Sequence, residues 1–152
     1  MILLDTNVLS ELMRPKPESI VVRWVDGRQE CDVWISAITV AEIRLGIELL
    51  PNGKRKSLLI SMADHMFHEE FAGRCLPFDY EAACKYSQIV ADRSRKGKPI
   101  SVEDAQIAAI AITADLSLAT RNIKDFEGIE ELNVINPWFD EIASFKGGKL
   151  QP

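Results

Sequence analysis

The first seven residues, Met1 to Asn7, constrain the fold more than any other stretch. Ile2, Leu3 and Leu4 run directly into Asp5, a pattern typical of a short buried strand that ends at a functional group. In an open α/β sheet, ligands bind in the crevice beyond the carboxyl ends of the strands. If this strand is central, Asp5 lies in that crevice, and the question becomes which residues join it there.

The rest of the chain alternates between helical and extended patterns. Helices are predicted at Thr6 to Glu11, Glu18 to Val25, Thr39 to Leu50, Lys54 to Phe71, Asp79 to Val90 and Ser101 to Ala114. Further strands are predicted at Asp32 to Ser36, Arg74 to Phe78, Ser117 to Thr120 and Asn133 to Ile135. This alternation predicts an α/β sandwich with a mostly parallel five-stranded sheet.

Composition fits one globular domain. The 152 residues are 47% hydrophobic and 27% charged, enough to bury about two thirds of the unfolded surface. We expect residues 1–145 to form this domain and residues 146–152 to form a flexible tail. The net charge of -5 provides no general attraction for nucleic acid, so any such contact must depend on local patches or a metal ion.

Cysteine usage and hydropathy indicate the compartment. Cys31, Cys75 and Cys84 form no C-x-x-C pair, which argues against a disulfide framework or a zinc ribbon, and buried reduced thiols are expected. The first apolar run lacks a preceding basic region and ends at Asp5, unlike a signal peptide. No stretch approaches the ~20 apolar residues of a membrane span. We expect a cytoplasmic protein without membrane contact.

Four acidic or amide positions share one topological property. Asp5, Glu42, Asp104 and the Asn122/Asp125 region each lie at a strand end or in the first turn of the following helix. Such positions converge at one edge of a parallel sheet, where oxygen donors suit Mg²⁺ or Mn²⁺. Zinc would instead require histidine or cysteine ligands.

Each acid also has a purely structural alternative. Glu42 and Asp104 are each three residues after a hydroxyl residue, Thr39 and Ser101, where an acid can cap a helix without catalysis. Asp5 can cap the first helix, and Asp125 is an ordinary loop acid. The two histidines, His65 and His68, lie on a mid-chain helix beside other acids and are expected to be exposed.

Three ordered segments resemble a known family. They are Ile2 to Glu11, Ser36 to Gly46, and Ala119 to Asn122 followed by Asn136 to Trp138. Together they are similar to PIN-domain ribonucleases and, more narrowly, to the VapC and FitB type of toxin from bacterial toxin–antitoxin operons. The resemblance implies a three-layer α/β/α PIN fold, an acidic pocket that binds Mg²⁺ or Mn²⁺, and a homodimer. It also implies inhibition by a small cognate antitoxin, through which alone the toxin would contact DNA.

The resemblance assigns roles to individual residues. It implies an endoribonuclease in which Asp5 and Asp104 bind the metal, and Glu42 is a ligand or a base that positions water. Several relatives have Asp where Asn122 stands, and Asp125 is the alternative carboxylate for that position. The remaining candidates contact RNA or the ligand carboxylates: Thr6, Asn7, Arg121 and the basic cluster Arg93 to Lys98, for which a solvated helix end is the alternative.

Other functional classes fit less well. A haloacid dehalogenase phosphatase needs a second Asp two residues after Asp5, where Asn7 stands, and a response-regulator receiver needs an adjacent acidic pair before its first helix. A weakened scaffold that only binds nucleic acid or protein is the main alternative, because Asn122 carries no charge. An antitoxin helix is expected to lie in an apolar groove with four candidate contacts or core residues: Leu9, Leu12, Val21 and Trp24.

Overall fold

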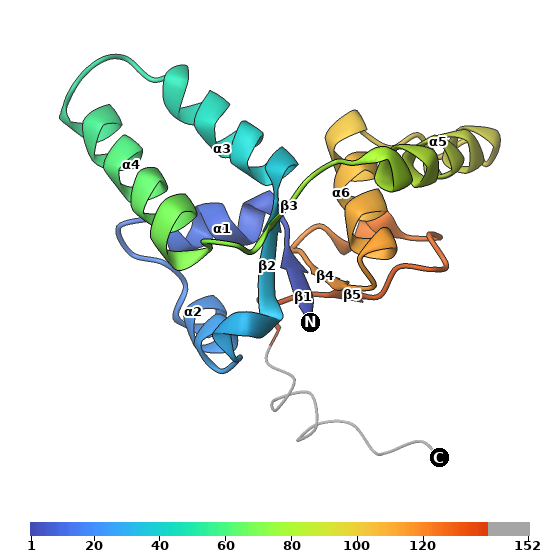
Figure 1. Ribbon diagram of the computed structural model, residues 1–152, viewed down its shortest axis with the longest axis horizontal. Helices are drawn as coiled ribbons and strands as arrows, with labels where there is room; N and C mark the ends of the chain where they lie inside the picture. Colours follow the sequence, from blue (N-terminus) through green and yellow to red (C-terminus); the bar gives the residue numbers. More distant parts are fainter. Residues whose placement is uncertain (140–152) are drawn as a thin grey trace.

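The computed structural model describes residues 1–139, which form a five-stranded sheet covered by helices (Figure 1). The strands are β1 (Ile2–Leu4), β2 (Val33–Ser36), β3 (Cys75–Leu76), β4 (Ser117–Ala119) and β5 (Val134–Ile135). The α-helices are α1 (Thr6–Leu12), α2 (Ser19–Asp26), α3 (Ala37–Glu48), α4 (Lys54–His65), α5 (Tyr80–Arg95) and α6 (Val102–Thr113). Three short helical turns are η1 (Glu30–Asp32), η2 (Met66–Glu70) and η3 (Ile123–Phe126). The predicted tail, residues 146–152, lies outside the described residues.

The sheet order places Asp5 where a ligand site is expected. The strand order is β3-β2-β1-β4-β5, and all described strand pairs are parallel. This confirms the predicted α/β class with a mostly parallel sheet. From β1 the chain winds first through β2 to β3, and later through β4 to β5 on the other side. The order therefore reverses between β1 and β4, and this switch point is where α/β folds bind ligands.

Strand alternation divides the core into two layers. Ile2 and Leu4 of β1 belong to the cluster formed with α1, α2, α3 and α4, whereas Leu3 belongs to the cluster formed with α5 and α6. The two groups of helices cover opposite faces of the sheet (Figure 1). Because both faces are covered, the central strand β1 is apolar throughout, as in other parallel sheets.

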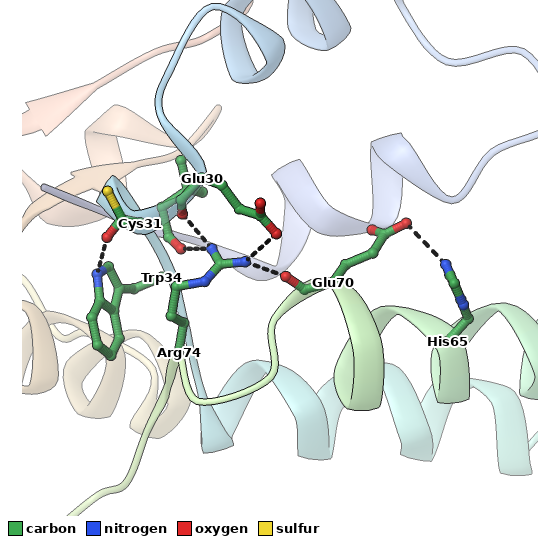
Figure 2. Close-up of polar contacts among 7 residues, drawn as sticks. Glu30, Cys31, Trp34, His65, Glu70 and Arg74 are labelled. Carbon is green, nitrogen blue, oxygen red and sulfur yellow. Dashed lines mark hydrogen bonds and ion pairs between the residues drawn. The ribbon is translucent and has the colours of Figure 1, made fainter.

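Arg74 fixes the edge of the sheet at the short strand β3 (Figure 2). Its guanidinium donates hydrogen bonds to the backbone carbonyls of Glu30, Val33 and Glu70, and pairs with the Glu30 carboxylate at 3.3 Å. The Arg74 side chain is only 13% exposed, although Glu30 and Glu70 are themselves exposed residues. Arg74 thereby connects η1, β2 and η2, and compensates for the few ladder hydrogen bonds that a two-residue strand can form.

Two local expectations were wrong. The helix predicted to run to Phe71 is α-helical only to His65 and continues as the π-helical segment η2, which sequence periodicity does not reveal. The cysteines are free but exposed rather than buried, because they lie in η1, on the edge strand and on the outer side of α5. In residues 1–139, no helix combines the length and apolar character that crossing a membrane requires.

Candidate acidic active site

Asp5 lies at the switch point and is nearly enclosed. It directly follows β1, and its backbone N–H donates to the carbonyl of Ala119 at the end of β4, at 2.9 Å. Its side chain accepts hydrogen bonds from the Thr6 backbone N–H at 2.8 Å, the Thr120 hydroxyl at 2.8 Å and the Asn7 amide at 3.2 Å. Asp5 also caps α1, so its structural and chemical roles coincide.

Burial makes the Asp5 carboxylate reluctant to ionise. Asp5 is only 4% exposed, and desolvation raises the pKa of its carboxyl from 3.8 to about 6. The hydrogen bonds from Thr120 and Thr6 act in the opposite direction and lower this pKa. The negative charges of Asp104 and Glu42 raise this pKa further. A carboxylate in this environment is stabilised in its ionised form by a cation.

Glu42 is held by the first helix rather than serving as a cap. The predicted capping pair of Thr39 and Glu42 is wrong, because Ser36 caps α3 and its hydroxyl accepts from the Thr39 backbone N–H at 3.1 Å. The Glu42 carboxylate instead accepts from the Thr6 hydroxyl at 2.7 Å. Since Ser36 performs the capping, that structural alternative no longer accounts for Glu42.

Asp104 lies in the first turn of α6, as predicted. Ser101 caps this helix, and its hydroxyl accepts from the Asp104 backbone N–H at 3.2 Å. Partial burial raises the pKa of the Asp104 carboxyl; the Ser101 hydrogen bond and Arg93 oppose this rise, whereas the nearby charges of Asp125 and Glu103 add to it. The side chain is half-buried, with its carboxylate beside the same cleft as Asp5.

One cleft brings together most of the predicted site residues. It has a volume of about 470 Å³ and lies beyond the carboxyl ends of β1 and β4. Seven predicted residues line it: Asp5, Thr6, Asn7, Glu42, Asp104, Arg121 and Asn122. Neither histidine lines this cleft, and His65 instead lies 3.6 Å from Glu70 (Figure 2). The lining is therefore dominated by oxygen donors.

Asp125 lies beside this cleft and does not line it. The loop after β4 forms the helical turn η3, with the Asp125 backbone N–H donating to the Asn122 carbonyl at 3.1 Å. Asn122 lines the acidic cleft and also a neighbouring cleft, whereas the exposed Asp125 lines only the neighbouring one. The charge of Asp125 nevertheless raises the pKa of Asp104, so the two carboxylates interact electrostatically.

Four polar residues in or beside the cleft were not predicted as site residues: Ser10, Glu11, Arg14 and Thr120. The buried Thr120 hydroxyl donates to Asp5 and accepts from the side-chain amide of Asn7 at 3.1 Å and from the Asn122 backbone N–H at 3.1 Å. Glu11, 5% exposed, lines the cleft one helical turn after Asn7. The i, i+4 spacing of Asn7 and Glu11 was the available signal for Glu11, whereas the contacts of Thr120 depend on the pairing of distant strands.

Arg93 has a different role from the one expected. It is buried and not part of a solvated basic surface: its guanidinium donates to the carbonyls of Lys98 at 2.7 Å, Asp125 at 2.9 Å and Glu127 at 3.1 Å. The acceptors belong to the loop that leads to α6 and to the turn η3 with the residue after it. Arg95, Lys96 and Lys98 remain exposed, so only they fit the expected surface cluster.

An apolar groove adjoins the acidic cleft. It has a volume of about 540 Å³ and shares Thr6, Ser10, Arg14 and Glu42 with that cleft. Its apolar lining comes mainly from α1, α3 and α4: Met13, Ile43, Ile47, Leu50, Leu58, Leu59 and Met62. None of the four predicted contact residues is among them. Leu9 and Val21 are fully buried in the core, and Leu12 and Trp24 pack against it, because the amphipathic faces of α1 and α2 cover the sheet.

The fold and the cleft define a class: a doubly wound α/β domain with carboxylates gathered at its switch point. Residues 2–132 match the PIN domain family. The chain is 47% identical over 140 residues to Toxin FitB of Neisseria gonorrhoeae, covering 92% of this chain and all of that protein. It is 40% identical over 138 residues to VapC ribonuclease Y4jK of Sinorhizobium fredii, covering 91% and 98% of the two chains.

A solved structure supports the same assignment. The structure of FitAB bound to an IR36 DNA fragment superposes with a TM-score of 0.86 at 46% identity, covering 93% of this chain and 98% of that one. Family match, sequence identity and fold agree. The chain belongs to the PIN-domain family, as its three motif segments predicted.

Proposed function

We propose that the protein is a metal-dependent endoribonuclease that acts as the toxin of a toxin–antitoxin pair. The observation that carries this proposal is the convergence of Asp5, Glu42 and Asp104 on one cleft at the switch point. The names of its relatives, a FitB toxin and a VapC ribonuclease, support the same activity. RNA is the proposed substrate and its phosphodiester bond the bond that is hydrolysed.

The donor set fits a hard divalent cation. Carboxylate, hydroxyl and amide oxygens line the cleft, and the raised pKa of Asp5 marks a position where positive charge is favourable. Within residues 1–139, no three His, Cys, Asp or Glu side chains are placed to enclose an ion. Mg²⁺ commonly uses only one or two carboxylates and keeps several waters, so Asp5 and Asp104 suffice as direct ligands. Mn²⁺ accepts the same donors.

The residues of the cleft have complementary tasks. A bound divalent ion supplies activation of water and neutralisation of phosphoryl charge. Asp5 and Asp104 hold the ion, and Glu42 orients the attacking water or contributes a further ligand. The Thr6 hydroxyl holds the Glu42 carboxylate through a 2.7 Å hydrogen bond, and the Asn7 side-chain amide orients the Asp5 carboxylate through a 3.2 Å hydrogen bond. Arg121 is positioned by its backbone hydrogen bond to the Asn7 side chain at 3.1 Å and offers its cation to the RNA backbone.

A cognate antitoxin is the proposed partner. FitAB, a complex in a related system, provides the precedent, and the apolar groove with Arg14 and Arg55 in its lining suits an amphipathic helix with an acidic flank. Because the groove reaches Glu42, a cation on the same partner can extend to the acidic cleft. In this proposal the toxin is a homodimer and contacts promoter DNA only through the antitoxin.

A cleavage assay tests the enzymatic proposal. The purified protein, freed of antitoxin, should cut RNA with Mg²⁺ or Mn²⁺ and lose this activity with a chelator. Asp5→Asn and Asp104→Asn should each lower the rate by at least about 100-fold, whereas the exposed acid variant Glu69→Gln serves as a matched control. Activity that persists in both site variants, or that ignores the chelator, would refute the proposal and favour a binding scaffold.

A further inference from the structure

A second cleft continues from the acidic one. It has a volume of about 820 Å³ and shares Arg121, Asn122 and Trp138 with the acidic cleft. Beyond these shared residues it extends over η3, Asn136 and Phe139, with Glu18 and Ile20 on its other side. A polymer whose phosphate occupies the acidic cleft would therefore place its neighbouring unit in this second cleft.

A cation and an aromatic ring, Arg121 and Trp138, lie where the two clefts meet. The Arg121 guanidinium carbon lies 5.1 Å from the centroid of the Trp138 ring, within the range of a cation–π interaction. Both residues are anchored: the Arg121 backbone N–H donates to the Asn7 side chain at 3.1 Å, and the Trp138 backbone N–H donates to the Asn136 side chain at 2.9 Å. The pair is thus fixed to the same framework as Asp5.

Trp138 packs against the edge of the core formed with α1 to α4, but this packing does not account for its indole N–H. Its indole N–H is buried and has no acceptor among residues 1–139, a situation that costs stability and that a phenylalanine would avoid. The next residue, Phe139, is 67% exposed beside the same cleft. Arg121 and Lys124 place two positive charges in the lining, beside the carboxylates of Glu18 and Asp125. Two aromatic rings and a planar guanidinium together form the kind of surface on which unpaired nucleobases stack.

We propose that this second cleft binds an unpaired nucleobase adjacent to the scissile phosphate, with Trp138 and Arg121 as its stacking surfaces. Unpaired RNA bases are commonly held on aromatic rings and guanidinium planes, and stacking tolerates every base because each has a π face. A paired base has its faces covered by its neighbours in the helix. The subsite therefore selects single-stranded RNA, and it depends on the ribonuclease function proposed above.

Binding of short single-stranded RNA tests the subsite. With divalent ions removed by a chelator so that no strand is cut, the affinity of the full chain for a fluorescein-labelled RNA is compared among variants. Trp138→Leu should weaken binding by about 5- to 100-fold, and Trp138→Phe should restore most of it. Trp34→Leu, which removes a tryptophan whose indole N–H bonds to Cys31 outside both clefts, is the control.

RNAs with one abasic position identify the base contact. In the wild type, removing the base next to the scissile bond should lower affinity, and in Trp138→Leu the same removal should cost little more. An equal abasic penalty in both proteins, or undiminished binding by Trp138→Leu, would overturn the subsite while cleavage by the wild type preserved the ribonuclease proposal. A wild type that neither binds nor cuts RNA would overturn both.

Discussion

At the scale of single residues, the site is organised by one buried carboxylate. Asp5 accepts three hydrogen bonds, yet desolvation still raises its pKa to about 6. Hydrogen bonds therefore only partly compensate for burial and for the nearby charges of Glu42 and Asp104. A bound cation would therefore favour the ionised form of Asp5. Without a metal ion, the ionised Asp5 lowers the free energy of unfolding.

Asp5 should make metal-free stability depend on pH. Its folded-state pKa of about 6 exceeds the ordinary value of 3.8, so the folded protein binds this proton more tightly than the unfolded chain. The resulting stabilisation is complete below pH 3.8 and is lost as pH rises through 6, by about 3 kcal/mol. In urea unfolding with a chelator present, the free energy of unfolding of Asp5→Asn should therefore rise relative to that of the wild type between pH 4 and pH 7. A difference independent of pH would contradict this assignment.

The fourth site position can be tested by exchanging Asn122 and Asp125. Asn122 lines the acidic cleft without charge, and Asp125 influences Asp104 from the neighbouring cleft. Because Asp125 acts at a distance, Asp125→Asn should raise the Mn²⁺ concentration needed for cleavage by only about 2- to 5-fold. Adding Asn122→Asp should recover this loss, whereas Asn122→Ala should not. An unchanged Mn²⁺ requirement in Asp125→Asn would leave Asp5, Glu42 and Asp104 as the whole charged site.

At the scale of elements, the cleft depends on connections that cross the chain. Arg93 of α5 binds the carbonyl of Lys98, in the segment that leads to α6, and the carbonyls of Asp125 and Glu127 around η3. One buried guanidinium thus couples the helix that carries Asp104 to the turn that follows Asn122. Arginine suits this role because its planar donors can satisfy several acceptors at once.

Replacing Arg93 should loosen this connection. Arg93→Lys keeps the charge but cannot reach all three carbonyls, so it should lower the free energy of unfolding by about 2 kcal/mol. Hydrogen exchange of the η3 amides should become faster, and cleavage should need more Mn²⁺. Arg95→Lys, two residues along the same helix and exposed, is the matched control. Equal effects of the two substitutions would show that the carbonyl contacts of Arg93 are unimportant.

The elements also show what sequence patterns can predict. The order of strands and helices followed from apolar periodicity, and the helix starts predicted at Asp79 and Ser101 are the residues that cap α5 and α6. Ser36 was missed, because its capping competes in sequence with the equally plausible Thr39. The roles of Thr120 and Arg93 were also beyond local patterns, since their partners are contributed by segments far away in the chain.

At the scale of the whole molecule, the acidic cleft and the apolar groove meet at Glu42. They share Thr6, Ser10, Arg14 and Glu42, so a partner that fills the groove borders the carboxylates of the cleft. Contact with one surface can therefore affect the other through α1 and α3 without any change in the sheet. This arrangement suits inhibition by an antitoxin that covers the groove and reaches into the cleft.

A charge placed in the groove should separate inhibition from catalysis. Leu58 is 61% exposed and lines the groove, so Leu58→Glu should leave the core intact but oppose an apolar helix and its acidic flank. Co-purification with the product of the neighbouring antitoxin gene should fall by about 10-fold or more, while RNA cleavage by the free protein remains unchanged. Leu49→Glu, at a residue 76% exposed outside the groove, is the control. If Leu58→Glu binds the antitoxin as tightly as Leu49→Glu does, the groove is not the docking surface. If the wild type forms no complex with that gene product, the toxin assignment fails even where RNA cleavage persists.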